Sequence, residues 1–329
     1  MRKFAWAGAC GSSRAAGQPA GTSDKARKQP TSHMMAIHKR FPLILFAWAL
    51  PLFMVSCGPS RPETGDNTLS VSIPPLQYFV DRLTDGAIDV NVMVPTGAGH
   101  ATYAPTTEQI RRLSDSGLYL RIGYLGYEKS WIGRLRELNP DMQVVNLSDH
   151  TELIRGPEVQ HGDHVHEGGI DPHIWMSPAV VKALLPVIRD ALTEAFPEHG
   201  EVIASNHPAL AAEVEAIDRA FRDLSGGLSQ RSFMIFHPAL TYLARDYGLV
   251  QHAIEYDGKE PSPAMLGRLI RLAREEAVSV IFIQEEYDMR SAALIREETG
   301  ARLVQINPMG YDWSASMHHL LDIFSGLQP

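Results

Sequence analysis

Three histidines occupy positions where predicted secondary-structure elements end or begin. His100 and His237 each follow an apolar run that predicts a strand, and His173 stands just before a segment that predicts a helix. Imidazole is a common ligand of Zn2+ and of other transition metals. One histidine in such a place is usually structural, whereas three from separate segments favour a metal site. Their spacing along the chain does not establish that they meet in space, so both interpretations stay open at this level.

A second group of histidines lies in the run HGDHVHE. Here His161, His164 and His166 are interspersed with Asp163 and followed by Glu167. One interpretation is a solvated polar loop that binds metals weakly, as any imidazole cluster does. The other, which we favour, is an accessory metal loop over residues 161–167 that raises the local metal concentration near the main site.

Strands and helices alternate along the chain in two similar sets. Short β-branched runs are separated by longer segments of helical period, which predicts parallel sheets covered by helices. Ligands of such sheets bind at the carboxyl ends of the strands, where His100 and His237 stand. The fold class is therefore α/β, with two lobes. The predicted strands are 69–73, 89–94, 118–122 and 144–147 in the first lobe, and 232–236, 252–255, 279–283 and 302–306 in the second.

One long helix is predicted to connect the lobes. Its apolar residues recur at helical spacing, and Gly226 and Gly227 close it, although an interior Pro208 predicts a kink or a restart near Asn206. No Gly-rich phosphate loop is present, which argues against a nucleotide enzyme. The predicted organisation is a lead and lipoprotein signal peptide at 1–56, a tether at 57–67, an N-terminal lobe at 68–197, the connecting helix at 198–226 and a C-terminal lobe at 227–329.

The N-terminal region resembles a lipoprotein signal peptide. A short basic stretch at 38–40 precedes a 15-residue apolar run at 41–55, which is shorter than the ~20 residues of a membrane span. Ser56, Cys57 and Gly58 then resemble a bacterial lipobox, in which the cysteine is acylated. We therefore expect an extracytoplasmic protein, periplasmic or at the cell surface, anchored to the membrane through lipidated Cys57.

The charge of the chain excludes one class of partner. Residues 1–56 carry eight lysines or arginines and one aspartate, so their removal takes the formal net charge from −8 to −15. Nucleic-acid binding needs a basic patch, and this acidity argues against it. It is compatible with cation capture.

Five sequence blocks carry a resemblance to a known family. GHATYAPT, DPHIWMSP, FHPALTYLARDYGL, IEYDGKEPSPA and IREETGARLVQINP are similar to blocks of the cluster A-I substrate-binding proteins of ABC importers, which bind zinc or manganese. The resemblance covers the chain from about residue 69 onward. It implies two α/β lobes joined by one long helix, with a metal site in the cleft between them. It also implies that His100, His173 and His237 are metal ligands and that an ABC permease is the partner of a monomeric carrier.

The sequence departs from the family pattern at the fourth ligand. Asn307 stands where many members have a ligating aspartate, and Gln284 replaces a frequent glutamate. The stretch GAGH before the first ligand is one residue shorter than usual. The fourth ligand is therefore water, Asn307 or a carboxylate such as Glu286.

The expected function is capture of Zn2+ for delivery to the permease, without catalysis. Three neutral imidazoles suit Zn2+ better than Mn2+, which prefers oxygen ligands. Because ligation requires neutral imidazole, zinc affinity is expected to fall as the pH drops through about 6.5. The alternatives are a manganese or iron carrier of the same family, a surface adhesin, and a secreted zinc hydrolase, for which no HExxH motif is present.

Overall fold

Two parallel four-stranded sheets with the same strand order form the centre of the structure. The computed structural model describes residues 68–100, 103–156, 159–161, 164–166, 169–255 and 259–327, all within one compact unit that begins at Pro62. The first sheet has the order β2-β1-β3-β4 and the second β10-β9-β7-β8. If the four strands of each sheet are numbered 1 to 4 in chain order, both sheets have the order 2-1-3-4. For the second sheet this order runs from β8 to β10. The predicted α/β fold class is confirmed, and the repeat that the sequence does not reveal is present in the topology.

The first lobe alternates strands and helices from its first strand onward. All of its neighbouring strands pair in parallel, which requires the helical crossovers that the sequence predicts. Thr106 and Gln109 begin the second helix with a reciprocal capping box. The elements are β1 (Thr68–Val71), α1 (Pro74–Thr84), β2 (Asp89–Val92), α2 (Thr107–Asp115), β3 (Leu118–Arg121), α3 (Gly126–Leu138), β4 (Gln143–Asn146) and the 3-10 helix η1 (Leu147–His150).

The second lobe repeats this pattern with four further parallel strands. Buried residues alternate between its two faces: Phe233 and Ile235 join the large core, while Met234 and Phe236 face a smaller core on the other side. This sheet is therefore covered by helices on both faces. The elements are β7 (Ser232–Ile235), α6 (Thr241–Tyr247), β8 (Val250–Ala253), α7 (Pro263–Glu275), β9 (Val280–Gln284), α8 (Arg290–Thr299), β10 (Arg302–Ile306) and α9 (Trp313–Ser325).

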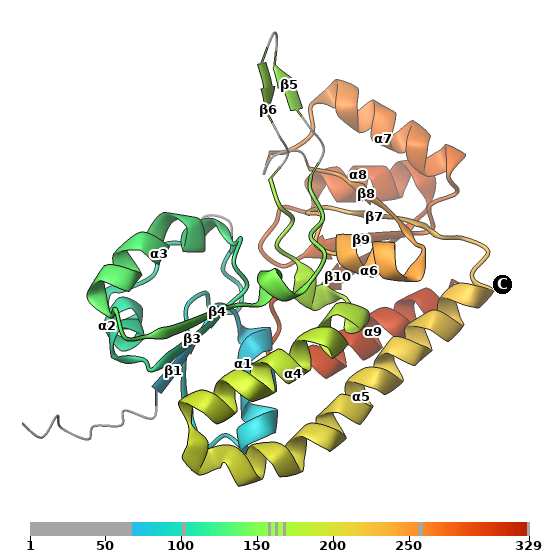
Figure 1. Cartoon of the computed structure of the whole chain (residues 1–329). Coiled ribbons are helices and arrows are strands. Elements are labelled where there is room, and N and C mark those ends of the chain that lie inside the picture. Colours follow the sequence, from blue (N-terminus) through green and yellow to red (C-terminus); the bar gives the residue numbers. More distant parts are fainter. Residues whose placement is uncertain are drawn as a thin grey trace, which may run out of the picture. The chain divides into compact units, whose positions relative to one another are not determined.

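A long helix, α5 (Gly200–Gly227), packs against helices of both lobes. It contacts α1 of the first lobe, α9 of the second and α4 (Pro178–Ala195), and Figure 1 shows it running alongside α4 and α9. The contact is apolar, since the residues at helical spacing are buried, namely Leu210, Val214, Ile217 and Phe221. The 3-10 helix η3 (Pro197–His199) precedes it.

The helix continues through Pro208 as one element, so the predicted restart near Asn206 is wrong. Packing on both lobes outweighs the one backbone hydrogen bond that a proline removes. The domain boundaries predicted from the sequence stay a prediction.

The His-rich segment forms a hairpin of two short strands. β5 (Val159–His161) and β6 (His164–His166) pair antiparallel, with His161 opposite His164, and Figure 1 shows the hairpin projecting from the rest of the lobe. The sequence predicts a flexible loop here, because the run is polar and flanked by glycines, and this prediction is wrong for the paired residues.

None of the described helices is long and apolar enough to cross a membrane. Cys57 and the predicted signal peptide lie outside the described residues.

Candidate metal centre

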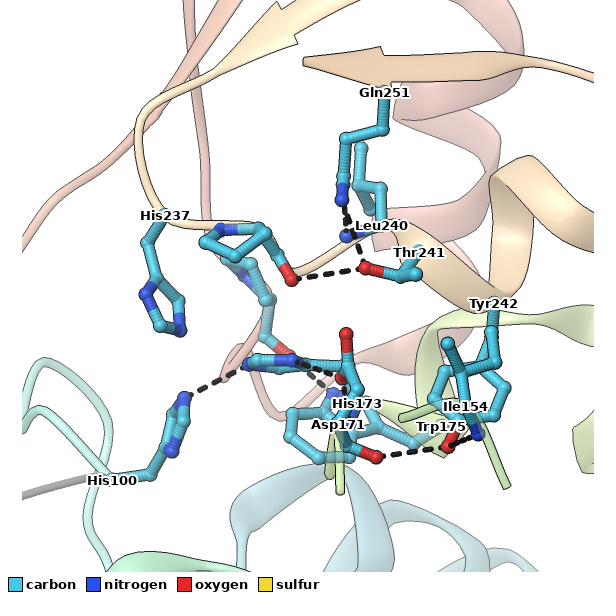
Figure 2. Close-up of polar contacts among 12 residues, drawn as sticks. His100, Ile154, Asp171, His173, Trp175, His237, Leu240, Thr241, Tyr242 and Gln251 are labelled. Carbon is cyan, nitrogen blue, oxygen red and sulfur yellow. Dashed lines mark hydrogen bonds and ion pairs between the residues drawn. The ribbon is translucent and has the colours of Figure 1, made fainter. Parts of the chain in front are cut away.

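Three histidines that lie far apart in the sequence meet at one point. His100, His173 and His237 each offer a ring nitrogen, and these ligand atoms all lie within 4.8 Å of one another. Figure 2 shows the three rings facing each other from different elements. Their ring centroids are 4.8 Å (His100 and His173), 5.5 Å (His100 and His237) and 5.1 Å (His173 and His237) apart.

His237 is fixed by the central strand of the second sheet. It lies two residues beyond the end of β7, and Gln284 at the end of the neighbouring strand β9 holds its backbone on both sides. The Gln284 side-chain oxygen accepts from the His237 backbone N at 3.3 Å, and its amide nitrogen donates to the His237 carbonyl at 2.7 Å. A glutamate carboxylate could not donate in this way, so this pair of hydrogen bonds requires the amide of Gln284.

His173 is fixed by the residues on either side of it. The Asp171 carboxylate accepts from the His173 backbone N at 2.9 Å and from its ring Nδ1 at 2.8 Å. The Tyr242 hydroxyl in turn donates to the Asp171 carbonyl at 2.8 Å. The 3-10 helix η2 (Ile174–Met176) follows, and its Trp175 Nε1 donates to the Pro308 carbonyl at 2.8 Å. His173 is thus attached to the second lobe although it precedes the connecting helix.

His100 lies in the loop between β2 and α2. The backbone N of Tyr103 donates to the carbonyl of Gly99, the residue before His100, at 3.1 Å. The Tyr103 hydroxyl donates to Gln109, whose amide nitrogen reaches the Val92 carbonyl at the end of β2. The first turn of α2 therefore anchors the loop that carries His100.

Burial keeps two of the three imidazoles uncharged. His100 and His173 are only 6% and 3% exposed. Burial, together with the neighbouring His173 and His237, lowers the pKa of His100 to about 2. Burial also lowers the pKa of His173, although Asp171 opposes the shift. Both rings are therefore neutral at physiological pH, which is the form that binds a metal.

Aromatic rings close the site on two sides. Trp175 lies against His173 with ring centroids 5.2 Å apart, and Tyr287 stacks on His237 at 5.4 Å. Each of these rings covers one side of an imidazole. The Nδ1 atom of His100 and the Nε2 atom of His237 are buried and have no hydrogen-bond partner within the part of the chain that the structure describes. The Nε2 atom of His237 is therefore available to bind a metal.

No carboxylate joins the group of three histidines among the described residues. Of the two predicted side-chain candidates for a fourth ligand, Asn307 uses its side-chain oxygen to accept from the backbone N of Met309 at 3.0 Å. Glu286 lies near His237, and burial raises its pKa. The three histidines by themselves give a tetrahedral ion three protein ligands and an open position.

Two carboxylates of the site are absent from the sequence interpretation. Asp171 binds His173, and the Glu255 carboxylate accepts from the His237 Nδ1 at 2.6 Å. Both leave a trace in the sequence: Asp171 precedes its histidine by two residues, and Glu255 is the last residue of the predicted strand 252–255. Of the accessory group, only the backbone of His161, His164 and His166 is described, in β5 and β6.

Comparison with known proteins identifies similar chains over most of the described length. The family model for "Zinc-uptake complex component A periplasmic" matches residues 70–325. The zinc-binding lipoprotein AdcA of Streptococcus pneumoniae (strain TIGR4) is 26% identical over 279 residues, which cover 81% of this chain and 54% of AdcA. The high-affinity zinc uptake system protein ZnuA of Bacillus subtilis is 26% identical, covering 78% of this chain and 85% of ZnuA.

A solved structure supports the same grouping. A crystal structure of ZnuA is 32% identical with a TM-score of 0.70, covering 79% of this chain and 98% of that one. This chain spans about half the length of the streptococcal relatives that it matches.

Proposed function

Because the chain belongs to the zinc-uptake complex component A family, we propose that it is the extracytoplasmic component of an ABC importer and captures Zn2+ for the permease. The observation that carries the proposal is the buried cluster of His100, His173 and His237, whose ligand atoms lie within 4.8 Å of one another. The names of the relatives describe zinc uptake and zinc binding, which agrees with this cargo.

Zinc suits the cluster better than manganese or iron. Three imidazoles without a carboxylate form a nitrogen site, and nitrogen sites bind Zn2+ more tightly than Mn2+ or Fe2+ in the Irving–Williams order. The rings of Trp175 and Tyr287, which contact His173 and His237, supply no charged oxygen that would favour a harder ion. The manganese and iron alternatives are therefore not favoured.

We propose that the fourth position holds water when zinc is bound. Asn307 already hydrogen-bonds to the backbone of Met309, and the Glu286 carboxylate is not part of the histidine group. Such an open position also occurs in catalytic zinc sites, where a general base activates the water. Since the family consists of transport proteins, we propose binding and release without hydrolysis.

Lipidated Cys57 is the proposed anchor, which keeps the carrier close to its permease. This assignment rests on the lipobox-like sequence alone and agrees with the lipoprotein name of AdcA. A monomer is the proposed form, because each chain supplies all three histidines of the site.

The hairpin is the proposed accessory metal site. Paired residues of two antiparallel strands, and residues two apart in one strand, share a face of a hairpin. By this rule the backbone register places His161, His164 and His166 on the same face. We propose that they bind zinc more weakly than the buried cluster, since the hairpin has only two short strands.

The test is the metal content and a competitive titration of the mature chain with Zn2+ and Mn2+. Wild type should hold one tightly bound zinc, which the variants His100→Ala, His173→Ala and His237→Ala lose. His318→Ala, which replaces an exposed histidine on α9, serves as the control. A preference for manganese, or zinc retained by the three cluster variants, would refute the proposal.

A further inference from the structure

We propose that Asp171 and Glu255 are positioning residues: they orient two of the three histidines toward the metal and balance its charge. The inference rests on the proposed function, since it concerns how the same site holds Zn2+. Its basis is that each carboxylate bonds the ring nitrogen that points away from the cluster, at 2.8 Å for Asp171 and 2.6 Å for Glu255.

The two hydrogen bonds determine which nitrogen carries the proton. An ionised carboxylate only accepts hydrogen bonds, so the Nδ1 atoms of His173 and His237 must be protonated. Their Nε2 atoms then hold the lone pairs that bind a metal. In Figure 2 the Nδ1 edge of the His173 ring faces Asp171 while its Nε2 edge faces His100. Both rings are thus set for ligation before the metal arrives.

Each carboxylate is itself held in place. Asp171 is fixed by the backbone N of His173 and, through its own carbonyl, by the Tyr242 hydroxyl. Glu255 is 7% exposed, and its backbone N donates to the Phe236 carbonyl at 3.1 Å. Asp171 is thus tied to α6 and Glu255 to the residue that follows β7, which restricts the rotation of both imidazoles.

Each of the two carboxylates lies behind an imidazole, where it can balance the charge of a bound dication. A Zn2+ ion buried among imidazoles alone would lack counter-charges, which is unfavourable away from bulk water. Glu255 Oε2 is buried without a hydrogen-bond partner among the described residues, as expected of a group that compensates a nearby cation.

His100 differs from the other two histidines. No carboxylate bonds its Nδ1 atom, which is buried and unpaired within the described chain. Its Nε2 lies 3.0 Å from the Nε2 of His173. Because the Nε2 atom of His173 carries a lone pair, it accepts this hydrogen bond, and the Nε2 atom of His100 must carry the proton that is donated. For zinc to bind the Nε2 atom of His100, the proton on that atom must leave. A proton is taken up at the Nδ1 atom of the same ring, so the ring stays neutral.

The experiment combines zinc affinity with the protonation pattern of the rings. Affinity is measured by competition with a chelator for wild type, Asp171→Asn and Glu255→Gln. Nitrogen-15 NMR of the metal-free proteins reports which ring nitrogen is protonated. The control is Asp218→Asn, which neutralises a buried carboxylate that bonds Tyr247 and does not touch the cluster.

We expect each of the two variants to weaken zinc binding about 10- to 100-fold, with the control within about twofold of wild type. In metal-free wild type, His173 and His237 should be protonated at Nδ1 and His100 at Nε2. The variants should show a larger Nε2-protonated fraction of the affected ring, a change that a loss of stability alone would not produce.

The inference is overturned if both variants bind zinc as tightly as the control. It is also overturned if wild-type His173 and His237 carry their protons on Nε2, a result that needs no variant to fold. Failure of the proposed function looks different, because wild type itself would then bind no zinc.

Discussion

Acid should destabilise the metal-free protein through His100. Burial and the neighbouring His173 and His237 lower the pKa of His100 to about 2, whereas an unfolded chain restores an ordinary histidine pKa of about 6.5. Below pH 6.5 the unfolded state therefore binds a proton that the folded state does not bind. By linkage, the free energy of unfolding falls as the pH drops through this range.

The magnitude follows from the two pKa values. Integrated from pH 7 to pH 5, an unfolded pKa of about 6.5 and a folded pKa far below 5 give a loss of about 2 kcal/mol for His100 alone. His173, whose pKa burial also lowers, adds to the loss in the same direction. A loss of this size is a large fraction of the stability of an ordinary domain.

Urea unfolding of the metal-free protein at pH 7 and pH 5 measures the effect. His100→Asn removes the titrating ring but keeps a neutral polar side chain, so it should lose about 2 kcal/mol less than wild type over this interval. His318→Asn, which replaces an exposed histidine, controls for the removal of a histidine as such.

Parallel losses in wild type and His100→Asn would refute the reasoning. They would mean that His100 is protonated equally in both states, and hence that it is not buried against the other two histidines. A smaller loss in wild type than in the variant would contradict the sign of the linkage.

Other predictions concern the site, the core and the hairpin. With His100 and His173 already neutral, zinc affinity should fall much less from pH 7 to 5.5 than the about 600-fold expected for three ordinary histidines. This is a weaker dependence than the sequence predicts, and zinc titrations at both pH values measure it. Phe221→Ala should cost about 3–5 kcal/mol in urea unfolding, because Phe221 is 1% exposed and stacks on Tyr247 between α5 and the second lobe. A cost below about 1 kcal/mol would mean that this contact does not stabilise the fold. Replacing the three hairpin histidines with alanine should remove only weak zinc binding and leave one tight site, as calorimetric titration would show. Loss of the tight site in that variant would contradict the assignment of the cluster.

The sequence determined the architecture because the architecture depends on local patterns. All eight strands of the two sheets lie within three residues of the predicted ranges, since short β-branched runs between helical segments have few other ways to fold. The long helix was predictable from its apolar period. Its passage through Pro208 was not, because packing on two lobes overrides a local breaker.

The shared strand order of the two sheets is visible only in three dimensions. Strand pairing joins residues far apart in the chain, and the apolar residues that fill each core are interchangeable enough to leave no repeat in the sequence. The His-rich hairpin is a similar case, since its pairing is set by the register of two very short strands.

The candidate ligands could be named from residue type, position after a strand and family resemblance. Whether His100, His173 and His237 meet could not be read from their spacing, because distances between separate segments depend on the packing of two lobes. The roles of Asp171 and Glu255 were hidden for the same reason. A carboxylate in a sequence has no preferred partner. Only the folded chain brings it to the Nδ1 atom of one histidine, which leaves the other nitrogen of that ring free to bind a metal.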